Sequence, residues 1–341
     1  MKIDIEERVL HFKQPAGTSR GVYTERRSWF VTVTDGEHVG IGECAPLPQL
    51  SCDDIPDYAE VLRHFCDEVE RSGKIPYDSL RDYPSMLFGL ETAMQSLHHS
   101  LGTSHHSSAF SRGEVGIPIN GLVWMGTYDE MLQRMEQKLE QGFRCVKLKI
   151  GAIDFDRELD LIKRIRQRFS HHEIELRVDA NGAFSYDEAL YKLELLSQYN
   201  IHSIEQPIRA GQWFYMSELC RESPLPIALD EELIGVNDPD QKRQMLNIIR
   251  PRYIILKPSL HGGMLGTREW VSIARDMGIG SWITSALESN IGLHAVAQLC
   301  ADIYGDQITM PQGLGTGQLF TDNIPMPLEI RKDQLWISTN S

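Results

Sequence analysis

Hydrophobic and polar residues alternate at the start of the chain, and this pattern predicts β-strands. Residues 2–12, KIDIEERVLHF, alternate as expected of a strand with one buried face. Two further strand-like runs, at 26–34 and 38–46, flank a DGE turn, which indicates a β-hairpin. Helical periodicity follows near 53–72 and 83–102. The order of strands and helices is typical of an α+β unit.

We expect this α+β unit to form a domain over residues 1–115. The segment KQPAGTSRGVYTE, at 13–25, is rich in Gly, Pro and Ser. It is either a plain surface loop or a mobile flap over a site, and we expect a flap at about 15–25. Residues 99–116 have few apolar positions and indicate the domain boundary.

From residue 117 onward, short apolar strands alternate with amphipathic helices. The first such helix is bounded by Thr127 at its start and Gly142 at its end. Alternating strands and helices predict βαβ units and a parallel sheet, and so many repeats favour a (β/α) barrel over a doubly wound sheet. We expect the barrel at 116–320 and a C-terminal segment, 321–341, that packs back on the first domain.

Composition narrows the classes of partner. The chain has 341 residues, 41% of them hydrophobic, and a formal net charge of −14. This charge disfavours nucleic acid or an anionic membrane as a partner, but local lysines or a metal ion still allow a small anionic carboxylate substrate. There is no signal-peptide pattern, no bilayer-spanning apolar run and no CxxC pair among six cysteines. We expect a cytoplasmic protein with reduced thiols, either a monomer or a homo-oligomer.

Charged residues occupy one face of each predicted barrel strand. In VKLKI, at 146–150, the two lysines share one face and the aliphatic residues share the other. Side chains of a barrel strand alternate between the interior and the helix layer. The aliphatic face therefore packs against helices, and the lysines point inward. The same parity places Arg177, Asp179 and Asn181 on the inward face of the next strand.

The inward charged residues recur at a regular spacing. Lys149 and Asp179 are 30 residues apart, and the following intervals to Glu205, Asp230 and Lys257 are 26, 25 and 27 residues. Each interval is about the length of one βα unit. Five successive strands therefore carry one charged residue each to the same end of the barrel, where barrel active sites lie.

Three of these residues, Asp179, Glu205 and Asp230, are candidate metal ligands. Carboxylates brought close together repel one another unless a cation compensates them. Carboxylate oxygens without cysteine or histidine companions suit a hard ion, so Mg²⁺ is the expected cofactor and Mn²⁺ an alternative. A metal-free cluster, salt-bridged to the lysines and Arg177, is the other interpretation.

The inward lysines indicate acid–base chemistry. A lysine beside a cation and a second lysine has its neutral form favoured, and a neutral amine can take a proton from carbon. A metal bound to the substrate carboxylate would stabilise the resulting enolate. Lys149 and Lys257 come from opposite sides of the acidic cluster, and Lys147 is either a supporting charge or a second base. The sequence thus predicts proton abstraction next to a carboxylate, followed by reprotonation or loss of a leaving group.

These motifs resemble those of the enolase superfamily, in its muconate-cycloisomerase-like subgroup. The matching stretches are KLK at 147–149, DAN at 179–181, EQP at 205–207, DE at 230–231 and KPS at 257–259. The resemblance covers nearly the whole chain and implies an α/β fold, a modified TIM barrel (β/α)₇β with an N-terminal α+β capping domain. It also implies the active residues: the Mg²⁺ ligands are Asp179, Glu205 and Asp230, and the acid–base pair is Lys149 and Lys257.

A closer resemblance links the chain to a group of dehydrating enzymes in this subgroup. It rests on GECAPLPQLS at 42–51, GTSRGVYTERR at 17–27 and SALESNIG at 285–292. These enzymes dehydrate a cyclohexadiene carboxylate with a succinyl chain, SHCHC, on the route to menaquinone. The resemblance implies that Lys149 removes the ring proton and returns it to the departing hydroxyl on the same face. Lys257 stays protonated and stabilises the enolate.

Further residues are expected around the substrate. The expected substrate contacts are Lys147, Arg20, Ser285, Leu287 and Glu288. Arg20 lies in the flap, where it would meet an anion, and the backbone amides of 285–292 would receive the succinyl carboxylate. The expected supporting residues are Arg177, Asn181 and Glu231, which would hold the ligands and lysines without binding the ion. For Arg177, a direct substrate contact is an equal alternative.

Other functions fit parts of the pattern. A dipeptide epimerase or an N-acylamino acid racemase would use the same lysines and metal. ITMPQGLG at 308–315 lacks the DxD motif typical of dipeptide epimerases, which weighs against the epimerase but not the racemase. A non-catalytic barrel that binds a divalent ion and an aldolase-type barrel with a Schiff-base lysine are rivals from other classes. HGGMLG at 261–266 is a weak phosphate-binding signal, and a tight loop into a helix is the favoured interpretation.

Overall fold

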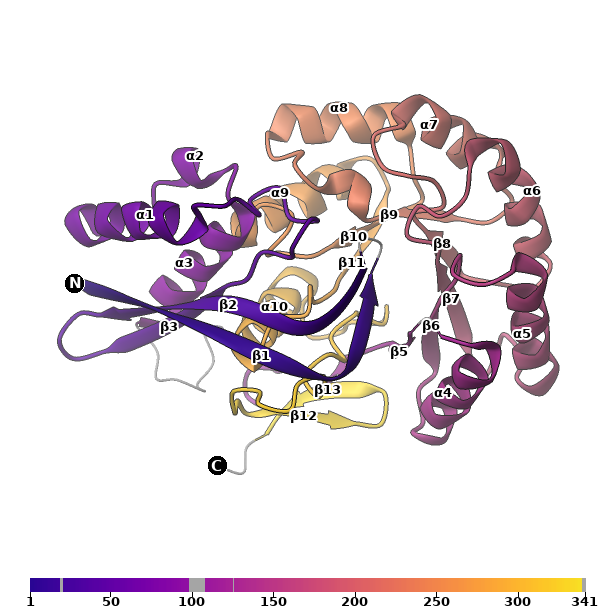
Figure 1. Ribbon diagram of the computed structural model, residues 1–341, viewed down its shortest axis with the longest axis horizontal. Helices are drawn as coiled ribbons and strands as arrows, with labels where there is room; N and C mark the ends of the chain where they lie inside the picture. Colours follow the sequence, from indigo (N-terminus) through magenta and orange to yellow (C-terminus); the bar gives the residue numbers. More distant parts are fainter. Residues whose placement is uncertain (19–20, 98–107, 125, 339–341) are drawn as a thin grey trace.

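The N-terminal part of the protein is an antiparallel sheet. The computed structural model describes residues 1–18, 21–97, 108–124 and 126–338. The sheet contains β1 (Lys2–Thr18), β2 (Gly21–Thr34) and β3 (Val39–Cys44), in that order (Figure 1). The β1–β2 ladder shifts register between His11 and Ala16 and continues to Thr18 opposite Gly21. The described part of the predicted flap is therefore an extension of two strands, not an irregular loop.

Three helices follow the sheet: α1 (Tyr58–Ser72), α2 (Tyr77–Leu80) and α3 (Pro84–Leu97). Almost every side chain of α3 is buried, because this helix lies between the N-terminal sheet and the helices of the barrel. Gly42 allows β3 to approach α3 closely. A methyl group on Gly42 would lie 1.9 Å from the carbonyl oxygen of Gly89.

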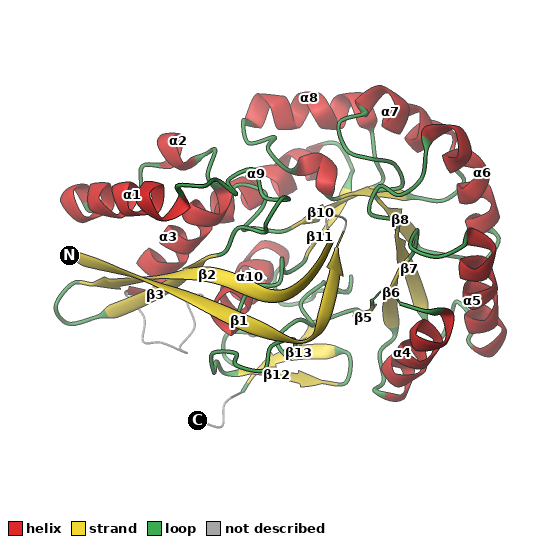
Figure 2. Ribbon diagram, in the orientation of Figure 1, coloured by secondary structure: helices red, strands yellow, loops and turns green. Residues whose placement is uncertain are grey.

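The second part is a curved sheet of seven parallel strands, surrounded by helices (Figure 2). The strands, in their order across the sheet, are β5 (Gly121–Val123), β6 (Cys145–Lys149), β7 (Glu175–Asp179), β8 (Ser203–Glu205), β9 (Ile227–Leu229), β10 (Tyr253–Leu256) and β11 (Gly280–Ile283). The helices are α4 (Tyr128–Glu140), α5 (Phe155–Arg168), α6 (Tyr186–Ser197), α7 (Trp213–Glu222), the 3₁₀ helix η1 (Glu231–Leu233), α8 (Pro239–Ile249), α9 (Gly263–Asp276) and α10 (Asn290–Tyr304).

The eighth strand position is filled by an extended segment and not by a regular strand. Gln312 forms an isolated parallel bridge with Ile119, before β5, and Gly313 forms one with Thr284, after β11. The amide of Gly313 donates to the carbonyl of Ile283 at 2.9 Å. These few contacts join the two edges of the curved sheet.

The C-terminal segment contacts both parts of the protein. Phe320 bridges Phe12 on β1, and the carboxylate of Asp322 accepts a hydrogen bond from the amide of His11 at 2.8 Å. The final hairpin, β12 (Leu328–Arg331) and β13 (Gln334–Ile337), pairs instead with β4 (Ile117–Pro118), at the start of the barrel. The beginning of the C-terminal segment thus contacts β1, whereas its final hairpin belongs to a separate sheet.

The apolar core follows the strand parity expected from the sequence. Val146, Leu148 and Ile150 are fully buried in one hydrophobic cluster with residues of the surrounding helices. No helix within the described ranges is long and apolar enough to cross a membrane. The six cysteines are free thiols.

Candidate active site

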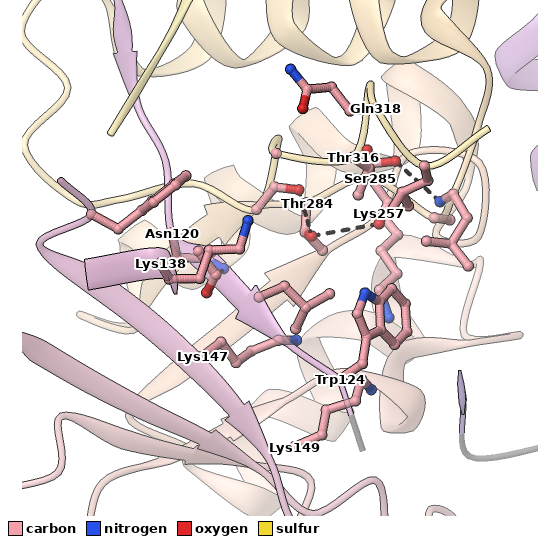
Figure 3. A pocket seen from close by; sticks show the side chains of 18 of the residues that line it. Asn120, Trp124, Lys138, Lys147, Lys149, Lys257, Thr284, Ser285, Thr316 and Gln318 are labelled. Carbon is pink, nitrogen blue, oxygen red and sulfur yellow. Dashed lines mark hydrogen bonds between the residues drawn. The ribbon is translucent and has the colours of Figure 1, made fainter. Parts of the chain in front are cut away.

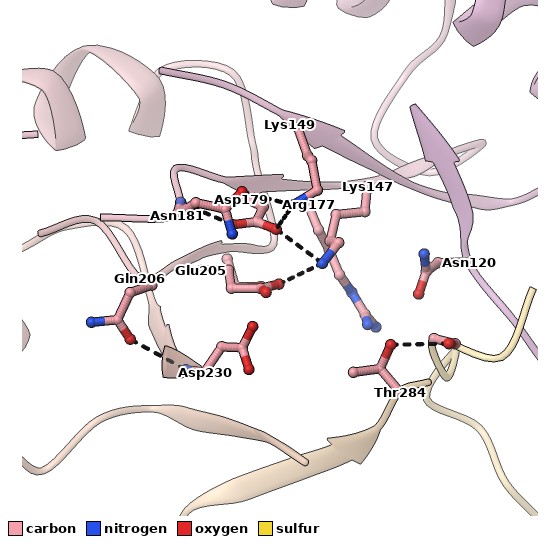
Figure 4. Close-up of polar contacts among 12 residues, drawn as sticks. Asn120, Lys147, Lys149, Arg177, Asp179, Asn181, Glu205, Gln206, Asp230 and Thr284 are labelled. Atoms are coloured by element: carbon pink, nitrogen blue, oxygen red, sulfur yellow. Dashed lines mark hydrogen bonds and ion pairs between the residues drawn. The ribbon is translucent and has the colours of Figure 1, made fainter. Parts of the chain in front are cut away.

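The ends of five barrel strands bring the predicted charged residues together. Lys149 is in register with Asp179, and Asp179 is in register with Glu205 on the next strand. Asp230 directly follows β9, and Lys257 directly follows β10. Equivalent positions on parallel strands lie at the same edge of the sheet. Figure 4 shows the side chains of Lys149, Asp179, Glu205 and Asp230 gathered on the inner face of the barrel.

Lys147 bridges two of the carboxylates. Its Nζ lies 3.1 Å from Asp179 Oδ2 and 2.8 Å from Glu205 Oε2. Burial alone would lower the pKa of Lys147, but the charges of Asp179 and Glu205 outweigh burial and raise it. In this arrangement Lys147 is suited to neutralising the charge of the two carboxylates.

Lys149 has a different set of partners. Its Nζ donates to Asp179 Oδ2 at 3.0 Å and to the amide oxygen of Asn181 at 2.7 Å. Asn181 in turn donates from Nδ2 to Glu231 Oε1 at 3.0 Å. The indole ring of Trp124 lies beside Lys149, with its centroid 5.9 Å from Nζ. A carboxylate, an amide and an aromatic ring together fix the direction of this amine.

Lys257 lies across the cluster from Lys149 and forms a short ion pair with Asp230 Oδ2. Burial alone would lower the pKa of Lys257, but the charges of Asp230 and Glu205 raise it. The backbone amide of Lys257 donates to Nδ1 of His261 at 2.9 Å. Burial lowers the pKa of His261 to about 3, so this imidazole is neutral and acts as a backbone acceptor. His261 was not assigned from the sequence.

The carboxylates have buried oxygens without partners. In the described structure Glu205 Oε1 and Asp230 Oδ1 are buried and accept no hydrogen bond. Such atoms are costly to bury and call for a partner. Within the residues described, no three His, Cys, Asp or Glu side chains are posed to hold a metal ion, and the carboxylates pair with lysines instead. The chemistry of the donors still fits a hard divalent ion.

The number of carboxyl groups in the cluster also favours a divalent cation. Three buried carboxylates and the half-buried Glu231 face three lysines. Burial and the neighbouring charge of Asp179 raise the pKa of Glu205 well above its ordinary value. Burial and the charge of Asp230 raise the pKa of Glu231. The three lysines therefore do not suffice to keep all four carboxyl groups ionised, and a divalent cation would favour their ionised forms.

A cavity of about 490 Å³ opens over this cluster (Figure 3). The inner lining includes Lys147, Lys149, Asn181, Glu231 and Lys257. Leu47 and Leu50, from the N-terminal domain, cover the cavity from the other side. The mixture of charged and apolar walls suits a small carboxylate with an apolar ring.

The expected substrate contacts after β11 divide into two groups. Ser285 and Leu287 line the cavity, but Glu288 does not. The buried Glu288 carboxylate accepts hydrogen bonds from Ser285 Oγ at 2.6 Å and from the Ala286 amide at 2.8 Å, and the Leu287 amide donates to Ser285 Oγ at 3.0 Å. The expectation for Glu288 is corrected: its carboxylate braces the loop. Of the backbone amides of 285–292, which were expected to receive the succinyl carboxylate, those of Ala286 and Leu287 are already bonded within the loop.

Arg177 lies below the cavity. Its guanidinium donates to Glu175 at 2.7 Å and to the carbonyl of Pro311 at 2.9 Å, and it lies 4.4 Å from the ring centroid of Trp282. Arg177 therefore supports the barrel interior, and it is not among the described residues that line the cavity. Arg20, expected to meet an anion, lies outside the described residues.

Two further residues that were not assigned from the sequence hold the site in place. The amide oxygen of Gln206 accepts hydrogen bonds from the amides of Asp230 at 3.3 Å and Glu232 at 3.2 Å, with Gln206 at a φ of 40°. Arg26 is 1% exposed and donates to the carbonyl of Leu287 at 3.2 Å and to carbonyls of the N-terminal domain. The EQP motif was a signal for Gln206, whereas nothing local distinguishes Arg26 from its exposed neighbour Arg27.

A comparison with known protein families identifies the superfamily of this chain. Residues 130–338 match the family described as Enolase C-terminal domain-like, which covers more than half of the chain. The chain therefore belongs to the enolase superfamily. The predicted fold class and the predicted superfamily are both confirmed.

Similarity over the full chain identifies the group within the superfamily. Residues 18–97 match the family described as MenC, N-terminal domain. The o-succinylbenzoate synthase of Desulfotalea psychrophila is 45% identical over 99% of both chains. The crystal structure of MenC from Desulfotalea psychrophila LSv54 has a TM-score of 0.84 and 42% identity over 99% of both chains. The L-Ala-D/L-Glu epimerase of Francisella tularensis subsp. novicida is 28% identical over 54% of this chain and 56% of its own length.

Proposed function

We propose that this protein is an o-succinylbenzoate synthase, which removes water from SHCHC to give 2-succinylbenzoate. The observation that carries the proposal is the position of Lys149 and Lys257 on opposite sides of one acidic cluster, at the floor of a cavity sized for a small carboxylate. Membership of the chain in the same family supports the substrate. The cytoplasm is the proposed location, and six free thiols agree with it.

Asp179, Glu205 and Asp230 would hold the metal ion, with Mg²⁺ proposed and Mn²⁺ as the alternative. The unpartnered oxygens of Glu205 and Asp230 support this assignment, as does the raised pKa of Glu205, which a bound cation would lower again. When bound, the ion would draw negative charge toward the substrate carboxylate and so favour the enolate.

Lys149, in its neutral form, takes the ring proton next to the carboxylate. The electrons of the broken C–H bond pass into the enolate, where Lys257 stabilises the charge from the opposite face. The same Lys149, now protonated, gives its proton to the departing hydroxyl as the C–O bond breaks. Water leaves and the ring becomes aromatic. The raised pKa of Lys257 supports its role as a fixed charge.

The test is an ultraviolet assay of 2-succinylbenzoate formation from SHCHC. We expect turnover with Mg²⁺, loss of turnover after EDTA treatment, and recovery when Mg²⁺ is restored. Turnover that survives complete removal of metal contradicts the metal assignment. Metal-loaded protein that does not dehydrate SHCHC at all contradicts the proposed reaction.

Epimerase or racemase activity on the same scaffold is less well supported. The segment at 308–315 carries no acidic pair for a substrate ammonium group, and the comparisons favour the synthase. A racemase remains compatible with the two lysines. Racemisation of N-acylamino acids, followed by circular dichroism, without any dehydration of SHCHC would replace the synthase by the racemase.

A further inference from the structure

The active-site cavity extends past the inner face of the barrel toward α4. Its lining includes Gly121 on β5 and Gly313 in the segment that closes the sheet. The sheet is thin there, since isolated bridges replace a regular eighth strand and glycines replace side chains. Beyond this seam the same cavity is lined by Lys138 and Gln141, at the end of α4, and by Lys332 in the final hairpin. We refer to Lys138, Gln141 and Lys332 as the lateral end of the cavity.

Lys138 is a half-buried cation with only neutral partners. Its Nζ lies 3.3 Å from the amide oxygen of Gln141 and 5.0 Å from the ring centroid of Phe143. Within the described part of the chain, no carboxylate lies within ion-pair distance of this amine. Burial lowers the pKa of Lys138, and no neighbouring charge opposes that effect. A partly desolvated ammonium group without a counter-ion favours binding of an anion.

Lysines outnumber carboxylates in the lining of the cavity, although the protein as a whole is acidic. The lysines in its lining are Lys138, Lys147, Lys149, Lys257 and Lys332, whereas Glu231 is the one carboxylate among its described lining residues. The whole chain has a net charge of −14. The lysines at the catalytic end are paired with buried carboxylates, whereas no described carboxylate pairs with Lys138 or Lys332, so the positive charge of the lateral end suits a ligand carboxylate.

The succinyl chain needs a partner for its terminal carboxylate. The loop amides of Ala286 and Leu287 are already bonded to Glu288 and Ser285. In Figure 3, Lys138 lies near Asn120 and Thr284, apart from Lys149. The lateral end therefore offers the ammonium group that the β11 loop does not.

We propose that Lys138 is a specificity-determining residue that binds the terminal carboxylate of the succinyl chain. Gln141 orients its ammonium group, and Lys332 adds positive potential at the opening. This inference rests on the proposed function and deepens it. The ring carboxylate is held at the catalytic end, and the second carboxylate reaches Lys138 through the seam of the barrel.

The test compares two ligands that differ only in the terminal group. Isothermal titration calorimetry in Mg²⁺ would measure binding of 2-succinylbenzoate and of 2-butyrylbenzoate, in which a methyl group replaces the terminal carboxylate. We expect Lys138→Gln to weaken 2-succinylbenzoate by about tenfold or more, the loss of one charge-assisted contact, and to leave 2-butyrylbenzoate unchanged. With SHCHC, KM rises and kcat changes little. Lys138→Arg restores part of the affinity.

Lys163→Gln is the matched control, because Lys163 is an exposed lysine on α5 that does not line the cavity. Unchanged binding of both ligands to Lys138→Gln, or an equal loss for both, overturns the inference. The two proposals fail separately. Wild-type protein that does not dehydrate SHCHC refutes the synthase, while the ratio of the two affinities still decides the role of Lys138.

Discussion

At the scale of single residues, the surroundings give two lysines different roles. Lys257 has a carboxylate largely to itself, through its ion pair with Asp230. Lys149 shares Asp179 with Lys147, and its shorter contact is to the neutral amide of Asn181. We propose on this ground that Lys257 provides a fixed charge and that Lys149 is the acid–base residue, because only Lys257 has a carboxylate of its own.

Arginine substitutions separate these roles, because arginine keeps its charge and does not act as a base. We expect Lys149→Arg to reduce kcat for dehydration of SHCHC by about 10³-fold or more, the usual range for a lost acid–base group. Lys257→Arg keeps the positive charge and is expected to retain clearly more activity than Lys257→Ala. The ultraviolet assay measures all three variants. Equal losses in Lys149→Arg and Lys257→Arg would show that the two lysines do not differ in role.

At the scale of secondary structure, the sequence predicted the parts that depend on local periodicity. The alternation in VKLKI fixes which side chains face inward, and the βα spacing carries Asp179 and Lys257 to the same barrel end. Closure of the sheet at Gln312 was not predictable in this way, since it depends on single bridges between distant segments. The same holds for Glu288, whose carboxylate is directed by the fold of its own loop.

At the start of α9, tertiary packing determines whether a glycine-rich segment is free to bind a ligand. The glycine-rich HGGMLG segment suggested a weak phosphate site. The carboxylate of Glu91, on α3, accepts hydrogen bonds from the amide of Leu265 at 3.0 Å and from that of Met264 at 2.5 Å. The capping domain therefore supplies the hydrogen-bond acceptors that the amides at this helix N-terminus require.

This contact predicts a pH effect on stability. Burial raises the pKa of Glu91 to about 7 from its ordinary value of 4.5. The folded protein thus binds a proton there that the unfolded chain has lost, and the associated stability is lost as pH rises toward 7. Between pH 5 and pH 8 the unfolding free energy of wild type should fall by about 2 kcal/mol relative to Glu91→Gln. Denaturant titrations at both pH values measure this difference.

The exposed Glu140, on α4, provides the control for this prediction. Glu140→Gln should follow the wild-type pH dependence. If Glu91→Gln also runs parallel to wild type, Glu91 is not protonated in the folded protein over this range.

At the scale of the whole molecule, the site belongs to both domains. Leu47 and Leu50 of the N-terminal domain cover a cavity whose chemistry comes from the barrel. Arg26 joins the two domains, because its guanidinium donates to the carbonyls of Ala45 and Pro46 on one side and of Leu287 on the other. The wall of the cavity at Leu287 is therefore held by a residue of the capping domain. No periodicity in the sequence indicates this contact, which exists only once both domains have folded.

Removing Arg26 should consequently weaken both the fold and substrate binding. Arg26→Met leaves several buried carbonyls without donors, and each costs about 1–3 kcal/mol. We expect the unfolding free energy to fall by about 3 kcal/mol, and KM for SHCHC to rise because the cavity wall at Leu287 loosens.

Arg27→Met is the matched control, since the Arg27 side chain is 56% exposed and pairs with Glu7 at 3.4 Å. Its stability should stay within about 0.5 kcal/mol of wild type. Denaturant unfolding with and without 2-succinylbenzoate tests both effects, and equal behaviour of the two variants would refute the joint role of Arg26.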